Sequence, residues 1–266
     1  MKKLPIGIQD FRKLRENNYI YVDKTELIFQ LLQGSCYFLS RPRRFGKFLL
    51  INTLKEIFSG SRELFDGLWI QDKIDWKKYP VLHIDFGRMD YKNQSLEKGL
   101  YSMLQELAEL NRVIFKGNTL KEQFRELITQ VSKTEKVVVL IDEYDKPIID
   151  YLTDIKQANE NRETLKNFYS AIKPMDEYLK FVFITGVSKF SKISIFSDLN
   201  NLNDITIGSK FSTLTGYTEK ELLLYFDPYI HELIDHLGYS KKKALEKIKQ
   251  WYNGYSWDGE HFVYNP

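Results

Sequence analysis

Residues 37–58 read YFLSRPRRFGKFLLINTLKEIF, and the character of the sequence changes twice within this stretch. The opening Tyr37-Phe38-Leu39 is a short apolar run bounded by turn residues, which is typical of a buried strand. After Gly46, apolar residues recur at helical spacing until Ser59-Gly60, which predicts a helix. Residues 40–47 are therefore expected to form a tight basic loop between a strand and a helix.

The loop has the position of a phosphate-binding loop and part of its composition. Loops of the G-x-x-x-x-G-K-[ST] type turn their backbone N–H groups inward at a helix N-terminus, and a lysine reaches the terminal phosphates. Gly46 and Lys47 match this pattern. Arg41 stands where the first glycine belongs, and Phe48 stands where Ser or Thr would bind Mg²⁺. Taken alone, the loop fits a basic surface turn without a ligand equally well.

An acidic strand end further along the chain adds to the pattern. Val137 to Ile141 are consecutive branched or leucine residues followed by Asp142-Glu143. Such a run is typical of a strand buried on both faces of a parallel sheet. In nucleotide hydrolases, an aspartate at this place holds Mg²⁺ and a glutamate polarises the attacking water. The alternative interpretation is two solvated acids at the end of a strand.

The rest of the chain alternates between strand and helix patterns, which predicts an α/β fold with a mostly parallel five-stranded sheet and helices on both faces. After Gly216 we expect a small helical region, with a capping box at residues 218–221 and a helix interrupted at Asp227-Pro228. The predicted domains are 1–215 and a helical lid or linker at 216–266, followed by a further domain. Strands are expected at 37–39, 81–86, 137–141, 181–186 and 204–207, and helices within about 94–132 and 158–178.

The composition excludes several classes of protein. With 266 residues, 43% hydrophobic and 28% charged, the chain can bury a sizeable core. Its single cysteine, Cys36, excludes an internal disulfide framework, and four scattered histidines argue against a zinc site. A formal net charge of +3 is far from the strongly basic balance of a dedicated nucleic-acid-binding protein. No apolar run approaches the roughly 20 residues of a membrane span, so we expect a cytoplasmic protein with no membrane partner.

Several long stretches of the sequence resemble the bacterial AAA-ATPase-like domain that is commonly joined to a PD-(D/E)XK nuclease domain. Arg41 in place of the first glycine is that family's own pattern, whereas Phe48 replaces a residue that is usually serine. The matching stretches are residues 4–11, 21–25, 40–47, 141–148, 184–191 and 251–255.

The resemblance implies a P-loop NTPase fold with ATP and Mg²⁺ as cofactors. Gly46 and Lys47 would bind the β and γ phosphates, Asp142 would hold Mg²⁺ and Glu143 would act as the catalytic base. Thr185 and Ser188 would help to orient the water. The complete nucleotide-binding stretch implied by the resemblance is Arg41, Pro42, Arg43, Arg44, Phe45, Gly46, Lys47 and Phe48.

We therefore expect an ATP-binding and ATP-hydrolysing domain that switches an attached module or a protein partner. The alternative is a degenerate nucleotide-binding or interaction module with little hydrolysis, because Phe48 replaces the residue that would bind Mg²⁺. Family analogy alone adds an attached nuclease domain and nucleic-acid processing. No arginine follows Arg162, so Lys189 or Lys192 would have to replace the arginine with which many ring-forming relatives sense the γ-phosphate.

Overall fold

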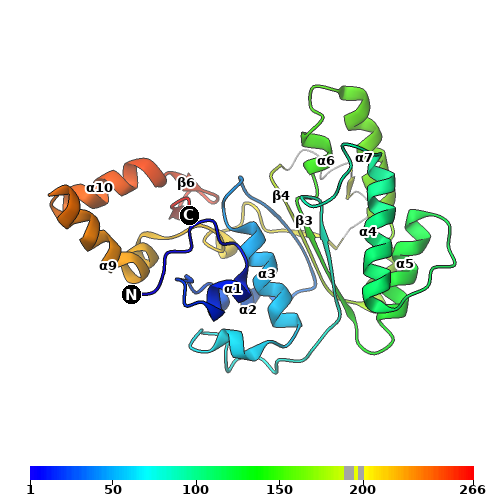
Figure 1. Ribbon diagram of the computed structural model, residues 1–266, viewed down its shortest axis with the longest axis horizontal. Helices are drawn as coiled ribbons and strands as arrows, with labels where there is room; N and C mark the ends of the chain where they lie inside the picture. The colour runs from blue at the N-terminus through cyan, green and yellow to red at the C-terminus, as the bar shows by residue number, and fades with distance from the viewer. Residues whose placement is uncertain (189–194, 197–200) are drawn as a thin grey trace.

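A parallel sheet forms the centre of the structure, which is a computed structural model that describes residues 1–188, 195–196 and 201–266 (Figure 1). Within these residues the sheet has five strands in the order β2-β3-β4-β1-β5, and each pair of neighbours is parallel. The predicted α/β fold with a parallel sheet is confirmed. The strands are β1 (Cys36–Ser40), β2 (Val81–Asp85), β3 (Val137–Asp142), β4 (Leu179–Gly186) and β5 (Asn203–Asp204).

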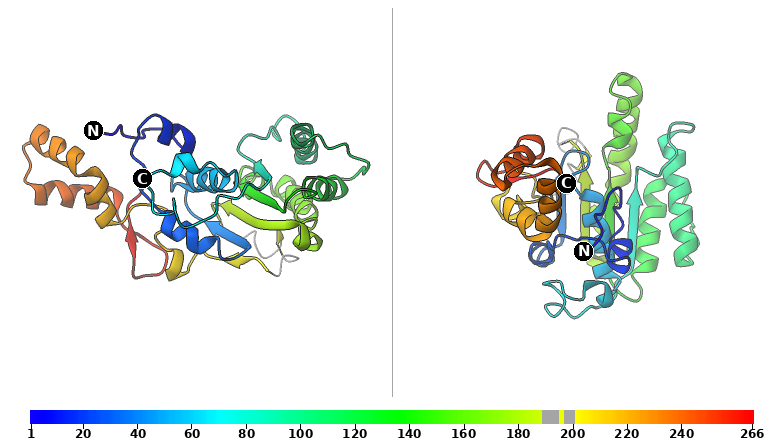
Figure 2. Two further views of the ribbon diagram at one scale, coloured as in Figure 1. Left: turned by 90° about the horizontal axis from the view of Figure 1, so that it is seen from below. Right: turned by 60° about the vertical axis from the view of Figure 1, so that its left-hand side comes forward.

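Helices cover both faces of this sheet (Figures 1 and 2). One face carries α1 (Phe11–Glu16), α2 (Thr25–Leu31) and α3 (Lys47–Phe58). The other carries α4 (Leu96–Asn111), α5 (Leu120–Val131) and α7 (Ile155–Tyr169), with the short α6 (Lys146–Ile149) after β3. In the described ranges, no helix combines the length and the hydropathy that crossing a bilayer requires. Short 3₁₀ turns occupy Arg62–Phe65, Lys173–Tyr178 and Ser209–Phe211.

The two faces of the sheet bury separate apolar cores. Strand β3 is buried along its whole length, and its side chains alternate between the two cores because successive residues of a strand point to opposite faces. Val137, Val139 and Ile141 join the core under α4, α5 and α7. Val138 and Leu140 join the core under α1, α2 and α3. This double burial explains why the strand reads as an unbroken apolar run.

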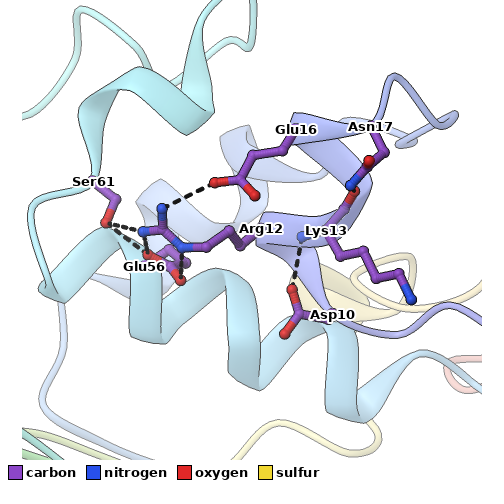
Figure 3. A network of polar contacts seen from close by, with 7 residues as sticks. All are labelled: Asp10, Arg12, Lys13, Glu16, Asn17, Glu56 and Ser61. Carbon is purple, nitrogen blue, oxygen red and sulfur yellow. Dashed lines mark hydrogen bonds and ion pairs between the residues drawn. The ribbon is translucent and has the colours of Figure 1, made fainter.

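The N-terminal lead-in is fastened to α3 through a polar network (Figure 3). Arg12 on α1 binds both carboxylate oxygens of Glu56 on α3, at 2.8 and 3.1 Å. Ser61 donates to the same carboxylate at 2.6 Å, and Asp10 caps α1 by accepting from the Lys13 amide. The lead-in is therefore an integral layer of the sheet domain.

Three sequence predictions need adjustment inside the sheet domain. The helical patterns predicted within about 94–132 form two helices with a break at 112–119, because Arg112 adopts a left-handed conformation and Thr119 opens α5 with a capping box. The predicted helix at 158–178 ends at Tyr169. The fifth strand is confined to Asn203–Asp204 instead of reaching residue 207.

The C-terminal region extends away from the sheet as a helical hairpin, α9 (Glu219–Leu237) and α10 (Lys241–Tyr252) (Figure 1). The capping box predicted at residues 218–221 is present. The predicted interruption at Asp227-Pro228 is wrong, because Pro228 lies inside α9. Proline removes the hydrogen bond to the carbonyl four residues earlier, and this belongs to Leu224, an exposed position where water can replace the partner.

Sequence reasoning missed an antiparallel hairpin at the end of this region. It consists of β6 (Tyr255–Ser256) and β7 (Phe262–Val263). Tyr264 then pairs with Tyr217 through two backbone hydrogen bonds, of 3.1 and 2.7 Å. The C-terminal region is therefore mixed helix and strand, and its last residues return to the point where it leaves the sheet domain.

Candidate functional site

The carboxyl ends of β1 and β3 place the predicted loop and the predicted acids at the same edge of the sheet, as parallel strands do. A cavity of about 890 Å³ lies beside them. It is lined by the loop and the start of α3, by Asp142 and Glu143, by the N-terminal residues 4–9 and by residues 214–217. This volume falls in the range of small-molecule sites in proteins.

The backbone of the loop is shaped to receive an anion. Arg44 and Gly46 have φ angles of +65° and +77°, and alternation of this kind turns successive N–H groups toward one point. Among the described residues, no group accepts from the amides of residues 43–46. The 12-residue helix α3 begins directly after them, and its unpaired first N–H groups add a positive dipole end. These features together favour a phosphate group.

Lys47 lies at the base of the loop with 7% of its surface exposed. Its Nζ donates to the carbonyl oxygens of Arg41 and Pro42, both at 2.9 Å. An ammonium group has three donors, so one remains for a phosphate oxygen. Burial lowers the pKa of Lys47, and the charges of Asp142 and Glu143 oppose that effect.

Asp142 is almost fully buried at the end of β3 and is held by two donors. The Thr185 hydroxyl on β4 and the Glu143 amide both donate to its Oδ1, the latter at 3.0 Å. Burial raises the pKa of Asp142 to about 6, although the hydrogen bond from Thr185 acts in the opposite direction. The Asp142 carboxylate is therefore held in one orientation, and a cation at this place would favour its charged form.

Glu143 has an unusual backbone and an unoccupied carboxylate. Its φ angle is +53°, a conformation that residues other than glycine seldom adopt outside constrained sites. Within the described part of the chain, no hydrogen bond reaches its side chain. A Cβ atom added to Gly87 would lie 3.0 Å from Glu143 Oε2, so the glycine leaves room for this carboxylate. The side chain borders the cavity and is free to bind a water molecule.

Phe48 also borders the cavity, at the place where related loops carry a hydroxyl. Its ring lies 5.9 Å from the Arg88 guanidinium and 6.4 Å from the His83 ring. The ring offers no oxygen, and the described residues contain no cluster of three or more side chains suited to a metal ion. A Mg²⁺ ion at this site would rely on Asp142, phosphate oxygens and water, which is how Mg²⁺ is commonly held with a nucleotide.

Two predicted loop residues and one predicted polar residue occupy other roles. Arg41 and Pro42 do not line the cavity and contribute their carbonyl groups to Lys47. Ser188 donates from its amide and its hydroxyl to Asp145, at 2.7 and 2.6 Å. Ser188 therefore fastens the end of β4 to the segment after β3. The arginines at 43 and 44 are exposed at the cavity, whereas Lys189 and Lys192 lie outside the described residues.

Sequence reasoning missed several residues that shape the site. Asp145, buried to 1% exposure, accepts from two amides and a hydroxyl beyond β4. Its position in the acidic stretch that follows β3 is the sequence feature that could have indicated a role in the site. Residues 4–9 and 214–217 line the cavity from distant parts of the chain, and no local pattern indicates this.

Comparison with known proteins agrees with this arrangement. A family model described as "Predicted AAA-ATPase" matches residues 5–196. A curated relative, "Uncharacterized protein in vnfD 5'region" of Azotobacter chroococcum mcd 1, is 46% identical over 271 aligned residues that include all of this chain. The chain spans about half the length of that relative. Because the family match extends over most of the chain and includes the loop and both acids, the chain belongs to the predicted AAA-ATPase family.

Proposed function

We propose that the chain binds ATP together with Mg²⁺ in this cavity and hydrolyses it. The observation that carries the proposal is the environment of Lys47, whose ammonium group lies at the base of the loop with one donor to spare. The charges of Asp142 and Glu143 act on it, and the loop amides of residues 43–46 have no acceptor among the described residues. A site with this combination of donors and acids suits a phosphate group and a water molecule together.

The loop and the rest of the cavity would bind different parts of the nucleotide. The amides of residues 43–46 and Lys47 would bind the phosphates. The cavity continues between residues 4–9 and 214–217, where Ile6, Ile8 and Leu214 contribute apolar surface that suits a nucleobase. Fixing both ends of the nucleotide would orient its terminal phosphate toward Glu143.

Asp142 and Glu143 would have different roles in hydrolysis. Asp142 would hold the ion, and Thr185 would keep its carboxylate in place. Bound Mg²⁺ would neutralise charge on the phosphates. Glu143 would accept a proton from the attacking water on a carboxylate oxygen, which is why its lack of a hydrogen-bond partner in the described chain matters.

A second candidate function is nucleotide binding with little turnover, and Phe48 is the observation that favours it. The missing hydroxyl removes one ligand from a Mg²⁺ ion that needs near-ideal octahedral geometry. Under either candidate, we propose that the nucleotide state controls an attached module or a protein partner. A nuclease module and nucleic-acid processing are the expectation from family analogy.

Calorimetric titration with ATP tests the proposal. Lys47→Ala should weaken binding at least tenfold, or about 1.4 kcal/mol, because it removes the charge and its spare donor. Lys55→Ala is the matched control, since Lys55 is an exposed lysine on the same helix. If the unmodified protein binds no ATP at millimolar concentration, the proposal is wrong.

A further inference from the structure

The β6–β7 hairpin contacts the loop at residues 40–47, called the phosphate loop below, through aromatic side chains. The Phe45 ring, fully buried in the loop, lies 4.7 Å from the Tyr255 ring and 5.4 Å from the Trp257 ring. The Arg41 guanidinium lies 4.3 Å from the centre of the Trp257 ring. Two loop residues thus pack on a segment more than 200 positions later in the chain.

Arg41 is a costly residue to bury, and its surroundings satisfy it only in part. It is 1% exposed, and its Nη1 donates to the carbonyl oxygens of Ser40 and Thr206, both at 2.9 Å. Its Nε and Nη2 have no hydrogen-bond partner among the described residues. Burial lowers the pKa of Arg41, and the negative charge of Asp204 opposes this shift only in part. The face of Trp257 therefore adds to the stabilisation of the buried guanidinium, since a tryptophan ring attracts a desolvated cation.

The same residue is joined to the groups that would bind phosphate. The Arg41 carbonyl accepts from Lys47 Nζ at 2.9 Å, and its amide donates to the Gly186 carbonyl at 3.1 Å. A shift of Arg41 would therefore displace a hydrogen-bond partner of Lys47 as well as the junction with β4. The guanidinium and the carbonyl belong to one residue, so Trp257 and Lys47 are linked through it.

Hydrogen bonds hold the hairpin in place at its end and at its turn. Tyr264 pairs with Tyr217, and the Asn265 amide donates to the Tyr252 carbonyl at 2.8 Å. Asp258 closes the turn by accepting from the amides of Glu260 and His261. These bonds give Trp257 a defined position relative to α10 and to the cavity wall at residues 214–217.

We infer that Trp257 is a positioning residue for the phosphate loop, which it holds in its anion-binding shape through Arg41 and Phe45. The consequence for ATP rests on the proposed function, whereas the consequence for the loop does not. Any ligand that reshapes the loop would also alter the hairpin, because coupling between two sites is reciprocal.

Hydrogen exchange measured by mass spectrometry tests the inference in the absence of nucleotide. Trp257→Leu should accelerate exchange of the hydrogen-bonded amides at the two ends of the loop, those of Arg41 and Leu50, about fivefold. Trp257→Phe should do so by less because it keeps an aromatic face. Trp251→Leu is the matched control, since Trp251 is 76% exposed on α10 and should leave the loop unchanged. The amides of β3 are the internal reference for overall stability.

Titration with ATP is the second measurement. Trp257→Leu should weaken ATP binding about fivefold, and ATP should slow exchange at residues 255–263 in the unmodified protein. Equal loop exchange in Trp257→Leu and Trp251→Leu overturns the inference, and so does a rise that includes β3 to the same extent. If Trp257→Leu does not fold, the comparison of Trp257→Phe with the control decides in the same way. If the loop responds but the unmodified protein binds no ATP, the proposed function fails and the positioning role stands.

Discussion

At the scale of single residues, Glu143 has an unfavourable backbone conformation. A left-handed backbone at a residue other than glycine costs of order 1–3 kcal/mol, and the surrounding structure must compensate for it. The conformation turns the chain directly after β3, where the carboxylate of the preceding Asp142 accepts a hydrogen bond from the Glu143 amide. The two acids are neighbours in sequence, yet the carboxylate of Asp142 accepts two hydrogen bonds and that of Glu143 accepts none from the described residues.

This difference predicts distinct roles for the two carboxylates. Glu143→Gln should lower the rate of ATP hydrolysis by about two orders of magnitude and change ATP affinity little, because the amide keeps its shape but cannot accept the proton. Steady-state hydrolysis assays and calorimetry measure the two quantities. Glu135→Gln, at a half-buried surface glutamate before β3, is the control. Hydrolysis at the parental rate in Glu143→Gln would show that another group is the base.

Phe48 distinguishes the two candidate functions. Phe48→Ser should raise the hydrolysis rate and lower the Mg²⁺ concentration needed for half-maximal activity, because a hydroxyl supplies the missing oxygen ligand. The measurement is hydrolysis as a function of Mg²⁺ concentration. Phe48→Leu is the control, since it removes the ring without adding an oxygen. A serine variant that melts at a lower temperature and hydrolyses ATP no faster would show that Phe48 serves packing alone.

At the scale of elements, the junction between β4 and the segment after β3 is tightly packed. A Cβ atom on Gly186 would lie 2.3 Å from the Tyr144 ring and 2.8 Å from Asp145 Oδ1. Both neighbours are buried, so neither can move aside easily. The end of β4 therefore requires glycine because of space and not because of its backbone angles.

Gly186→Ala should destabilise the protein by about 1–3 kcal/mol, the usual cost of forcing extra volume into a packed interior. Urea denaturation measures the free energy of unfolding. Gly208→Ala is the control, because a Cβ there meets nothing within 4 Å and its φ of −105° suits any residue. Equal stability of the two variants would mean that the junction is loosely packed.

Element patterns also explain which parts of the fold were predictable. The loop, the unbroken apolar run of β3 and the capping box at residues 218–221 are encoded by neighbouring residues, so the sequence indicates them correctly. Helix α9 continues through Pro228 because its exposed position tolerates the lost hydrogen bond. The rule that proline ends a helix considers only neighbouring residues and takes no account of exposure. The contacts of Trp257 with Arg41 and Phe45 depend on tertiary packing, and the sequence carries no periodic signal for them.

For the molecule as a whole, an ion pair joins the N-terminal lead-in to the C-terminal helices. Lys24, 9% exposed, places its Nζ 2.6 Å from both carboxylate oxygens of Glu221, the glutamate of the α9 capping box. The Tyr225 hydroxyl accepts from the adjacent Asp23 amide. The pair therefore ties α9 to the segment that precedes α2, and it does so beside the cavity.

A double-mutant cycle with Lys24→Met and Glu221→Gln should give a coupling energy of about 1–3 kcal/mol in thermal or urea unfolding, because a buried ion left without its partner is strongly penalised. The same cycle on Lys241 and Asp227, an exposed pair at 2.9 Å, should give less than about 1 kcal/mol. Coupling of similar size in both cycles would show that α9 does not depend on the Lys24 pair.

The contact between Trp257 and Arg41 also has a consequence for protein synthesis. The ribosome adds Trp257 216 residues after Arg41, an interval of about 10–40 s at about 5–20 residues per second. During that time α3 and the remaining strands of the sheet are translated, while the guanidinium of Arg41 lacks its aromatic cover. A nascent chain would therefore acquire its phosphate loop in final form only when the hairpin emerges, and nascent chains stalled before residue 257 should bind ATP more weakly than released protein.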